Sequence, residues 1–263
     1  MVDFNPDCSK KIISHNQLVQ LCARNSEEDA SKKCVDAVET LACATPNRAH
    51  RSLKWVYSHT KSEDVHDAMS GVVRYFANKA NDDKALRPIV RSMLTYMVQH
   101  SCYDYATYDA FDSIQYALGY KLVDSLVREF KKGTWSAGRI LLGRATQKDL
   151  RRHALIFKRM MNRTDGYYAG DYLVYVRAAW LYWRTVSNTS EERVDMVIDA
   201  LENAEDDVLR CGAAWELEDF VGEPQFAKRV RAALSKAATN DGDWSVRKVA
   251  TDVLKENYTA CWM

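Results

Sequence analysis

The sequence predicts an all-α protein built as a right-handed α-solenoid of antiparallel helix pairs, curved, with one concave face, in a single domain over residues 1–263. Apolar residues recur at helical spacing in segments of roughly 10–18 residues, separated by short polar breaks. We find no strand-like alternation and no hairpin dipeptide between apolar runs. The chain has only 10 Gly and 4 Pro, which disfavours the many tight turns of an all-β fold.

Each helix is justified by an apolar face, a cap or a break. The second helix carries Cys34, Val38 and Leu41 on one face, Ser62 begins a cap signal, and Pro88 stands near a helix start, where its missing N–H is tolerated. The predicted helices cover about 10–25, 27–41, a segment around 53–57, 65–76, 88–97, 104–118, 120–132, 135–144, 147–162, 171–187, 190–203, 206–221, 224–238 and 243–257.

The C-terminal half contains an internal repeat. An offset of 37 aligns Arg210 with Arg247, Ala213 with Ala250 and Leu217 with Leu254. One helix pair cannot bury its apolar face alone, so such units stack on their neighbours. The stretch 206–224 resembles the inner helix of a HEAT-type repeat, with an acidic start, an Arg, paired Ala and a Gly-x-Pro exit. A non-repeating helical bundle is the alternative.

Charge is divided strongly along the chain. Residues 128–163 hold 11 basic and 2 acidic side chains, whereas 191–223 hold 12 acidic and 2 basic ones, although the whole chain has a formal net charge of only +1. The basic block follows an aromatic and acidic helix predicted at 103–114, and an acid beside a cationic surface suits a protein that holds a polyanion. The simpler interpretation is a solvated charged face.

Composition excludes several classes of protein. No run of 18 apolar residues suggests a membrane span, and the first residues do not form a signal peptide. The six His show no metal-ligand spacing, and no phosphate loop or GxGxxG occurs, so we expect no metal and no cofactor. The seven Cys include no CxxC pair, which predicts reduced thiols in a cytoplasmic protein, several of them buried.

One helix carries the strongest functional signal. The run from Tyr108 to Ile114, Tyr-Asp-Ala-Phe-Asp-Ser-Ile, with Leu118-Gly119 after it, resembles the AlkD family of DNA glycosylases, which are built from HEAT-like repeats. The resemblance implies that Asp112 is the catalytic acid and that Tyr108 stands where the family usually has Trp.

Two later blocks, in the same order, extend the resemblance to about residues 88–258. Leu150–Phe157 is similar to the family's helix whose Arg contacts the DNA backbone, a role that falls on Arg152. Residues 214–220 resemble the run whose Trp packs against the damaged nucleotide, which assigns that role to Trp215. The gap between these two blocks is longer than in the family, so Trp180 and Trp183 are rivals. Glu218 stands where the family tends to have Arg. Arg144, Lys148 and Arg151 are further candidates for phosphate contacts.

The chemistry can be argued from the residues themselves. Cleavage of an N-glycosidic bond develops positive charge on the deoxyribose, and a carboxylate about 4 Å away contributes roughly 4 kcal/mol at an effective dielectric constant of about 20. Tyr108 and Asp112 are four apart and share a helix face. No Lys is placed to form a Schiff base, so we expect a monofunctional enzyme acting on duplex DNA that carries cationic N3- or N7-alkylated purines.

Two other interpretations stay open. The first is a non-catalytic HEAT-like scaffold that binds a protein or nucleic-acid partner, and the second is a family member that binds nucleic acid without catalysis. In each case we expect a monomer that does not bind membranes, cytoplasmic in location and associated with the nucleoid if prokaryotic.

Overall fold

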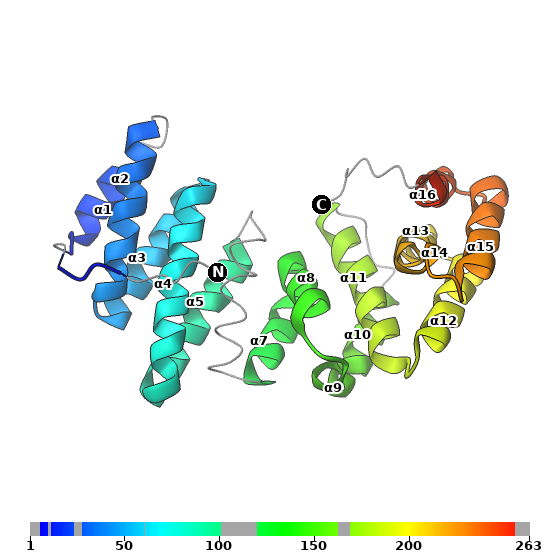
Figure 1. Cartoon of the computed structure of the whole chain (residues 1–263), viewed down its shortest axis with the longest axis horizontal. Coiled ribbons are helices and arrows are strands. Elements are labelled where there is room, and N and C mark those ends of the chain that lie inside the picture. The colour runs from blue at the N-terminus through cyan, green and yellow to red at the C-terminus, as the bar shows by residue number, and fades with distance from the viewer. Residues whose placement is uncertain are drawn as a thin grey trace. The chain divides into compact units, whose positions relative to one another are not determined.

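The computed structural model describes residues 6–9, 12–23, 28–60, 62–100, 120–162 and 169–255. Every regular element in these ranges is helical, which confirms the all-α class (Figure 1). The chain divides into two compact units, residues 1–140 and 141–263. In a repeat array each repeat contacts only its neighbours, so the division into two units does not distinguish one domain from two. The single domain therefore stays a prediction.

The first unit is a layered stack of helices. Helix α1 packs on α2 and α3, α2 packs on α4, and α3 packs on α5, so alternate helices share a layer. The elements are α1 (His15–Cys22), α2 (Glu28–Glu39), η1 (Thr40–Cys43), α3 (Pro46–His59), α4 (Glu63–Asp82), η2 (Lys84–Leu86), α5 (Arg87–His100) and α7 (Tyr120–Lys131), followed by α8 (Trp135–Arg144), which ends in the second unit.

Two disulfides hold the first helix pair. Cys22 at the end of α1 is bonded to Cys34 in α2, and Cys8 is bonded to Cys43 at the end of η1, with Cα–Cα distances of 5.0 and 5.4 Å. The expectation of reduced thiols is therefore wrong for these four residues. The sequence hides the pairing because partners 12 and 35 positions apart meet only when α1 folds back on α2. Cys211 is a buried free thiol, as expected.

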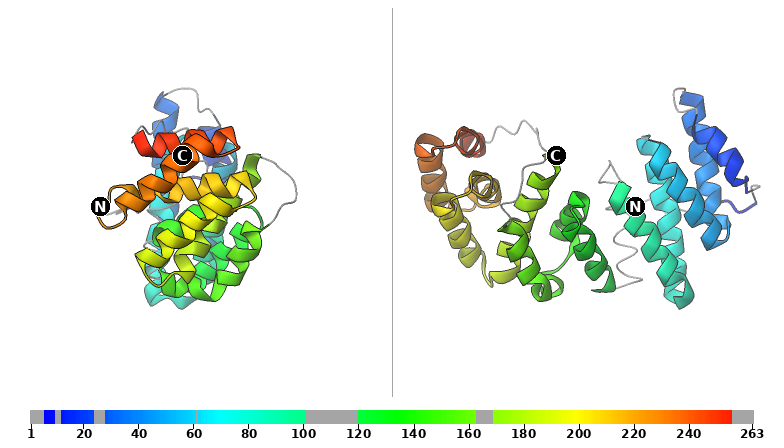
Figure 2. Two further views of the ribbon diagram at one scale, coloured as in Figure 1. Left: turned by 90° about the vertical axis from the view of Figure 1, so that its right-hand side faces the viewer. Right: turned by 180° about the vertical axis from the view of Figure 1, so that it is seen from behind.

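The second unit repeats one packing scheme. Helix α11 packs on α10 and α13, α13 packs on α16, and α12 packs on α15, as can be followed in Figures 1 and 2. Its elements are α9 (Gln147–Leu150), η3 (Arg151–His153), α10 (Ala154–Met161), α11 (Ala169–Val186), α12 (Ser190–Asn203), α13 (Asp207–Glu216), α14 (Glu218–Val221), α15 (Ala227–Asn240) and α16 (Trp244–Lys255). The helices predicted at 147–162 and 206–221 are thus each interrupted, at η3 and at Leu217.

The contact between α11 and α13 depends on a glycine. A Cβ atom at Gly212 would lie 3.1 Å from Val176 Cγ1, closer than ordinary van der Waals contact. The backbone carbonyl of Gly212 also accepts a hydrogen bond of 2.8 Å from Trp180 Nε1. Gly212 therefore lets the two helices approach closely enough for the indole to reach the neighbouring backbone.

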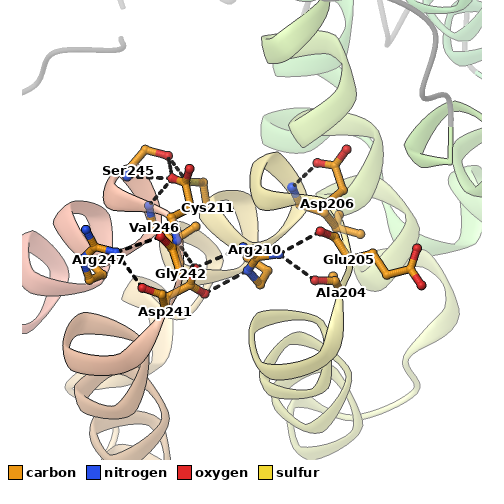
Figure 3. A network of polar contacts seen from close by, with 12 residues as sticks. Ala204, Glu205, Asp206, Arg210, Cys211, Asp241, Gly242, Ser245, Val246 and Arg247 are labelled. Atoms are coloured by element: carbon orange, nitrogen blue, oxygen red, sulfur yellow. Dashed lines mark hydrogen bonds and ion pairs between the residues drawn. The ribbon is translucent and has the colours of Figure 1, made fainter.

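Two arginines make equivalent contacts in successive repeats (Figure 3). Arg210 Nη1 donates to the carbonyl oxygens of Ala204 and Glu205 at 2.8 and 3.0 Å. Arg247 Nη1 donates to those of Asp241 and Gly242 at 2.6 and 3.0 Å. Donors and acceptors are all offset by 37 positions, as the internal repeat predicts. Each arginine thus satisfies the backbone of the loop before its own helix.

Arg210 also joins the two repeats. Its Nε and Nη2 donate to the two carboxylate oxygens of Asp241 at 2.8 and 3.1 Å, and the side chain of Asp241 is only 9% exposed. A forked contact of this kind fixes direction as well as distance. We call Arg210, Asp241 and Arg247 the repeat clamp.

The repeat clamp predicts unequal effects of two matched substitutions. Arg210→Ala leaves the half-buried Asp241 carboxylate without its guanidinium and should lower the free energy of unfolding by about 2–4 kcal/mol. Arg247→Ala removes only hydrogen bonds to carbonyls and should lower it by about 1–2 kcal/mol. Urea denaturation of both variants measures the difference, and equal losses would show that the contact between repeats contributes nothing.

The disulfides predict a redox-dependent first unit. Reduction should lower the free energy of unfolding by about 2–4 kcal/mol per bond, because the closed loops restrict the unfolded chain. Peptide mapping after alkylation in denaturant should find Cys8, Cys22, Cys34 and Cys43 unlabelled until a reductant is added. Labelling of these four residues in air-oxidised protein would contradict the pairing.

Candidate nucleic-acid interface

The described part of the basic block that lies in the second unit forms an exposed cationic segment. Between residues 144 and 159 it holds six basic side chains and one acid, Asp149. All six cations are exposed: Arg144, Lys148, Arg151, Arg152, Lys158 and Arg159. We call these six residues the cationic segment.

Asp149 is occupied by the local fold. Its carboxylate accepts hydrogen bonds from the amide and the hydroxyl of Thr146, while the Thr146 hydroxyl accepts from the Asp149 amide. This is a capping box, which satisfies the first N–H groups of a helix. The one acid therefore begins α9, and the charge of the segment stays strongly positive.

The cationic segment is anchored to the end of α11. Gln147 Nε2 donates to the carbonyl of Ser187, and Arg184 in α11 donates to the carbonyl of Leu142. Arg151 Nη2 donates to Asn188 Oδ1 at 3.1 Å. Buried Leu150 and Phe157 hold the other side of the segment. These contacts fix the backbone from which the cations project.

The arginine assigned to the DNA backbone lies within this segment. Arg152 is exposed in η3, and its Nε lies 3.2 Å from Nε2 of His153. Lys158, six residues further on in α10, has its Nζ 5.9 Å from the ring centroid of Tyr182. Arg144, Lys148, Arg151 and Arg152, all predicted from the sequence, are neighbours in the chain, and the structure shows that each is exposed.

The three candidate tryptophans have different surroundings. Trp183 is 2% exposed in the core of the second unit, so its proposed contact with a ligand is corrected to a packing role. Trp180 and Trp215 are half-buried and pack edge to face, with ring centroids 6.4 Å apart. The ring centroid of Tyr172, on α11, lies 6.2 Å from that of Trp215. Trp215 and Trp180 therefore form one aromatic cluster.

Tyr108 and Asp112 lie outside the described residues. Neither their mutual geometry nor their distance from Arg152 and Trp215 is therefore part of the site described above. The cationic segment and the aromatic cluster both belong to the second unit, and they can be compared without reference to the first.

A buried carboxylate stands next to Trp215 in the sequence. Glu216 is 8% exposed on α13, and its Oε1 accepts a hydrogen bond of 2.7 Å from Arg193 Nε on α12. The same guanidinium donates to Asp219 at 3.2 Å and lies 4.9 Å from the Phe220 ring centroid. Burial raises the pKa of Glu216 to about 7, although Arg193 acts in the opposite direction.

Other ionisable groups offer little chemistry. Burial raises the pKa of Cys211 to about 11, so its thiol is a poor nucleophile at neutral pH. Within the described ranges, no group of three or more His, Cys, Asp or Glu side chains could hold a metal ion. None of the helices in those ranges has the length and apolar character needed to cross a bilayer.

The sequence reasoning missed a face of the first unit. Helices α3 and α5 each carry an aromatic residue followed four positions later by His, at Trp55 and His59 and at Tyr96 and His100. The signal was present as a 41-residue recurrence and as the lack of any acid in either helix.

Comparisons of the chain with protein-family models, with curated proteins and with solved structures found no significant match.

The buried carboxylate predicts an unusual pH dependence of stability. Because the pKa of Glu216 is higher in the folded than in the unfolded chain, its contribution is fully present below about pH 4.5 and is lost as pH rises through about 7. The free energy of unfolding should fall by about 1–3 kcal/mol more in the native chain than in Glu216→Gln between pH 5 and pH 8.

Denaturant unfolding at several pH values measures this difference. Glu205→Gln, at an exposed position of the same unit, is the matched control and should follow the native chain. Parallel curves for the native chain and Glu216→Gln would contradict the raised pKa.

Proposed function

We propose that this chain is a HEAT-like α-solenoid that binds duplex DNA and acts as a monofunctional DNA glycosylase on cationic N3- or N7-alkylated purines. The observation that carries DNA binding is the cationic segment, in which six exposed basic side chains stand with a single acid that serves as a helix cap. Phosphate contacts of this type supply much of the affinity of DNA-binding proteins.

The solenoid is supported by the spacing of contacts between helices. In the first unit His15 contacts Ser52 and Ser58 contacts Tyr96, at separations of 37 and 38 residues. In the second unit Arg151 contacts Asn188 at a separation of 37. Other hydrogen bonds between described helices have different separations, such as 42 residues for Ser92 and His50 and 23 residues for Arg193 and Glu216. Each helix therefore contacts helices near it in the sequence, as in a stack of helix pairs.

The glycosylase activity rests on the resemblance at Tyr108–Ile114 and on the chemistry of Asp112. A carboxylate beside the sugar stabilises the positive charge of the transition state, and an alkylated cationic base is already a good leaving group. Arg152 would contact the DNA backbone and Trp215 the damaged nucleotide. The chemistry calls for no cofactor.

A non-catalytic scaffold is the second candidate, and the aromatic residues favour it. Trp183 is a core residue, and Trp180 is held by Gly212 and by the edge of Trp215. This packing uses surface that a nucleotide would need. The cytoplasmic location was predicted from reduced thiols, and the two disulfides remove that argument because such bonds persist in oxidising environments.

An electrophoretic mobility shift on plain duplex DNA tests the binding. The double variant Arg151→Gln with Arg152→Gln should weaken binding roughly tenfold at low salt and reduce the slope of log affinity against log salt by about 2. Lys236→Gln, an exposed lysine on α15 that pairs with Glu202, is the control and should leave both quantities unchanged. Lack of duplex binding by the native chain at low salt would remove the proposal.

Release of alkylated purines from treated DNA then separates enzyme from scaffold. We expect Asp112→Asn to retain duplex binding and to abolish release. Binding without release by the native chain would leave the scaffold, and undiminished release by Asp112→Asn would remove Asp112 from the catalytic role.

A further inference from the structure

All the charged side chains of α3 and α5 in the first unit are basic. Residues 46–59 hold three basic side chains and no acid, and residues 87–100 hold two basic side chains and no acid. Arg48, Arg51 and Lys54 on α3 are exposed. Adjacent helices without a single carboxylate indicate a surface suited to an anionic partner.

On this face each helix carries a pair of rings in close contact, stacked in α3 and tilted in α5. The rings of Trp55 and His59 lie parallel within 7°, with centroids 4.3 Å apart. Those of Tyr96 and His100 lie 4.2 Å apart at an angle of 32°. In both pairs the first ring is half-buried and the imidazole is exposed. We call each pair of rings a platform, because its outer ring, the imidazole, is exposed to solvent.

The platforms are held in place before any ligand binds. His59 Nδ1 lies 2.8 Å from the carbonyl oxygen of Trp55, which orients the imidazole over the indole. The hydroxyls of Tyr96 and Ser58 lie 3.0 Å apart, and Lys54 Nζ lies 5.4 Å from the Tyr96 ring centroid. Tyr96 is thus fixed against α3, beside the first platform. Side chains ordered in this way lose little entropy on binding.

The spacing of helices selects the form of the partner. Packed helices lie about 8–10 Å apart, more than twice the rise of about 3.4 Å along the axis that separates successive stacked bases of one strand in a duplex. Bases that reach one platform on each helix must therefore be unstacked. The rings of a duplex are covered by their neighbours, whereas those of a single strand can be splayed onto His, Trp or Tyr.

We propose that the α3–α5 face binds single-stranded nucleic acid, with one base stacked on His59, another on His100, and the phosphates held by Arg51 and Lys54. A base on each platform and a cation beside it is the arrangement that sequence-tolerant single-strand binding requires. This surface is separate from the cationic segment, and the inference does not depend on glycosylase activity or on duplex binding.

Fluorescence anisotropy on the full chain tests the proposal with two labelled probes, a thymidine oligonucleotide of about 10 nucleotides and an abasic strand of the same length. The abasic strand keeps the phosphates and lacks the rings. The native chain should bind the thymidine strand at least fivefold more tightly than the abasic one. The double variant His59→Ala with His100→Ala should lose that preference and bind the two strands alike.

A charge variant separates stacking from electrostatics. Arg51→Gln should weaken binding to both strands by a similar factor and keep the preference for bases, whereas Lys84→Gln, an exposed lysine of η2, should change neither. Circular dichroism melting verifies that the histidine variant is folded. Equal affinity of the native chain for the two strands, or a base preference that survives in the folded histidine variant, would overturn the proposal.

Discussion

Packing of one helix between two others is the constraint on which the second unit depends. A single pair of helices leaves an apolar face exposed, so α13 must pack against both α11 and α16. Burial of apolar surface has no preferred direction, whereas the hydrogen bonds of the repeat clamp do. Arg210 reaches both the loop before its own helix and Asp241 of the next repeat, and these contacts allow only one alignment of the two repeats. On the other side of α13, Gly212 lets this helix approach α11 closely.

This constraint also explains where the exposed chemistry lies. Apolar side chains are used between helices, so charge is left for the outer faces, and its sign changes from one segment to the next. The cationic segment has its only acid in a cap, α3 and α5 have no acid, and α12–α14 carry many, one of them buried as Glu216. A nearly neutral chain can thereby present surfaces of opposite sign to different partners.

Much of the fold was accessible from the sequence because helical periodicity survives in every described element. The alignment of Arg210 with Arg247 was predicted and corresponds to equivalent hydrogen bonds. The pairing of Cys22 with Cys34 was not predicted, since residues 12 positions apart meet only after the turn between two helices. The interruption at Leu217 was missed as well, because the apolar pattern continues through it.

The candidate site was predicted less well. Arg151 was identified by its charge and Arg152 by the family resemblance as well, and charge is a good guide to exposure. For tryptophan the residue type does not distinguish core from surface, and Trp183 was placed wrongly for that reason. The rings of Trp55 and His59 were overlooked because the sequence shows their recurrence in α5 but not that the two rings stack.

The two disulfides are nested, since the loop closed by Cys22 and Cys34 lies within the loop closed by Cys8 and Cys43. A protease that cuts the backbone between Cys22 and Cys34 would therefore release no fragment, because both bonds still tether the two ends. The N-terminal helices would keep their native neighbours after such a cut, and the damage would become visible only when the disulfides are reduced.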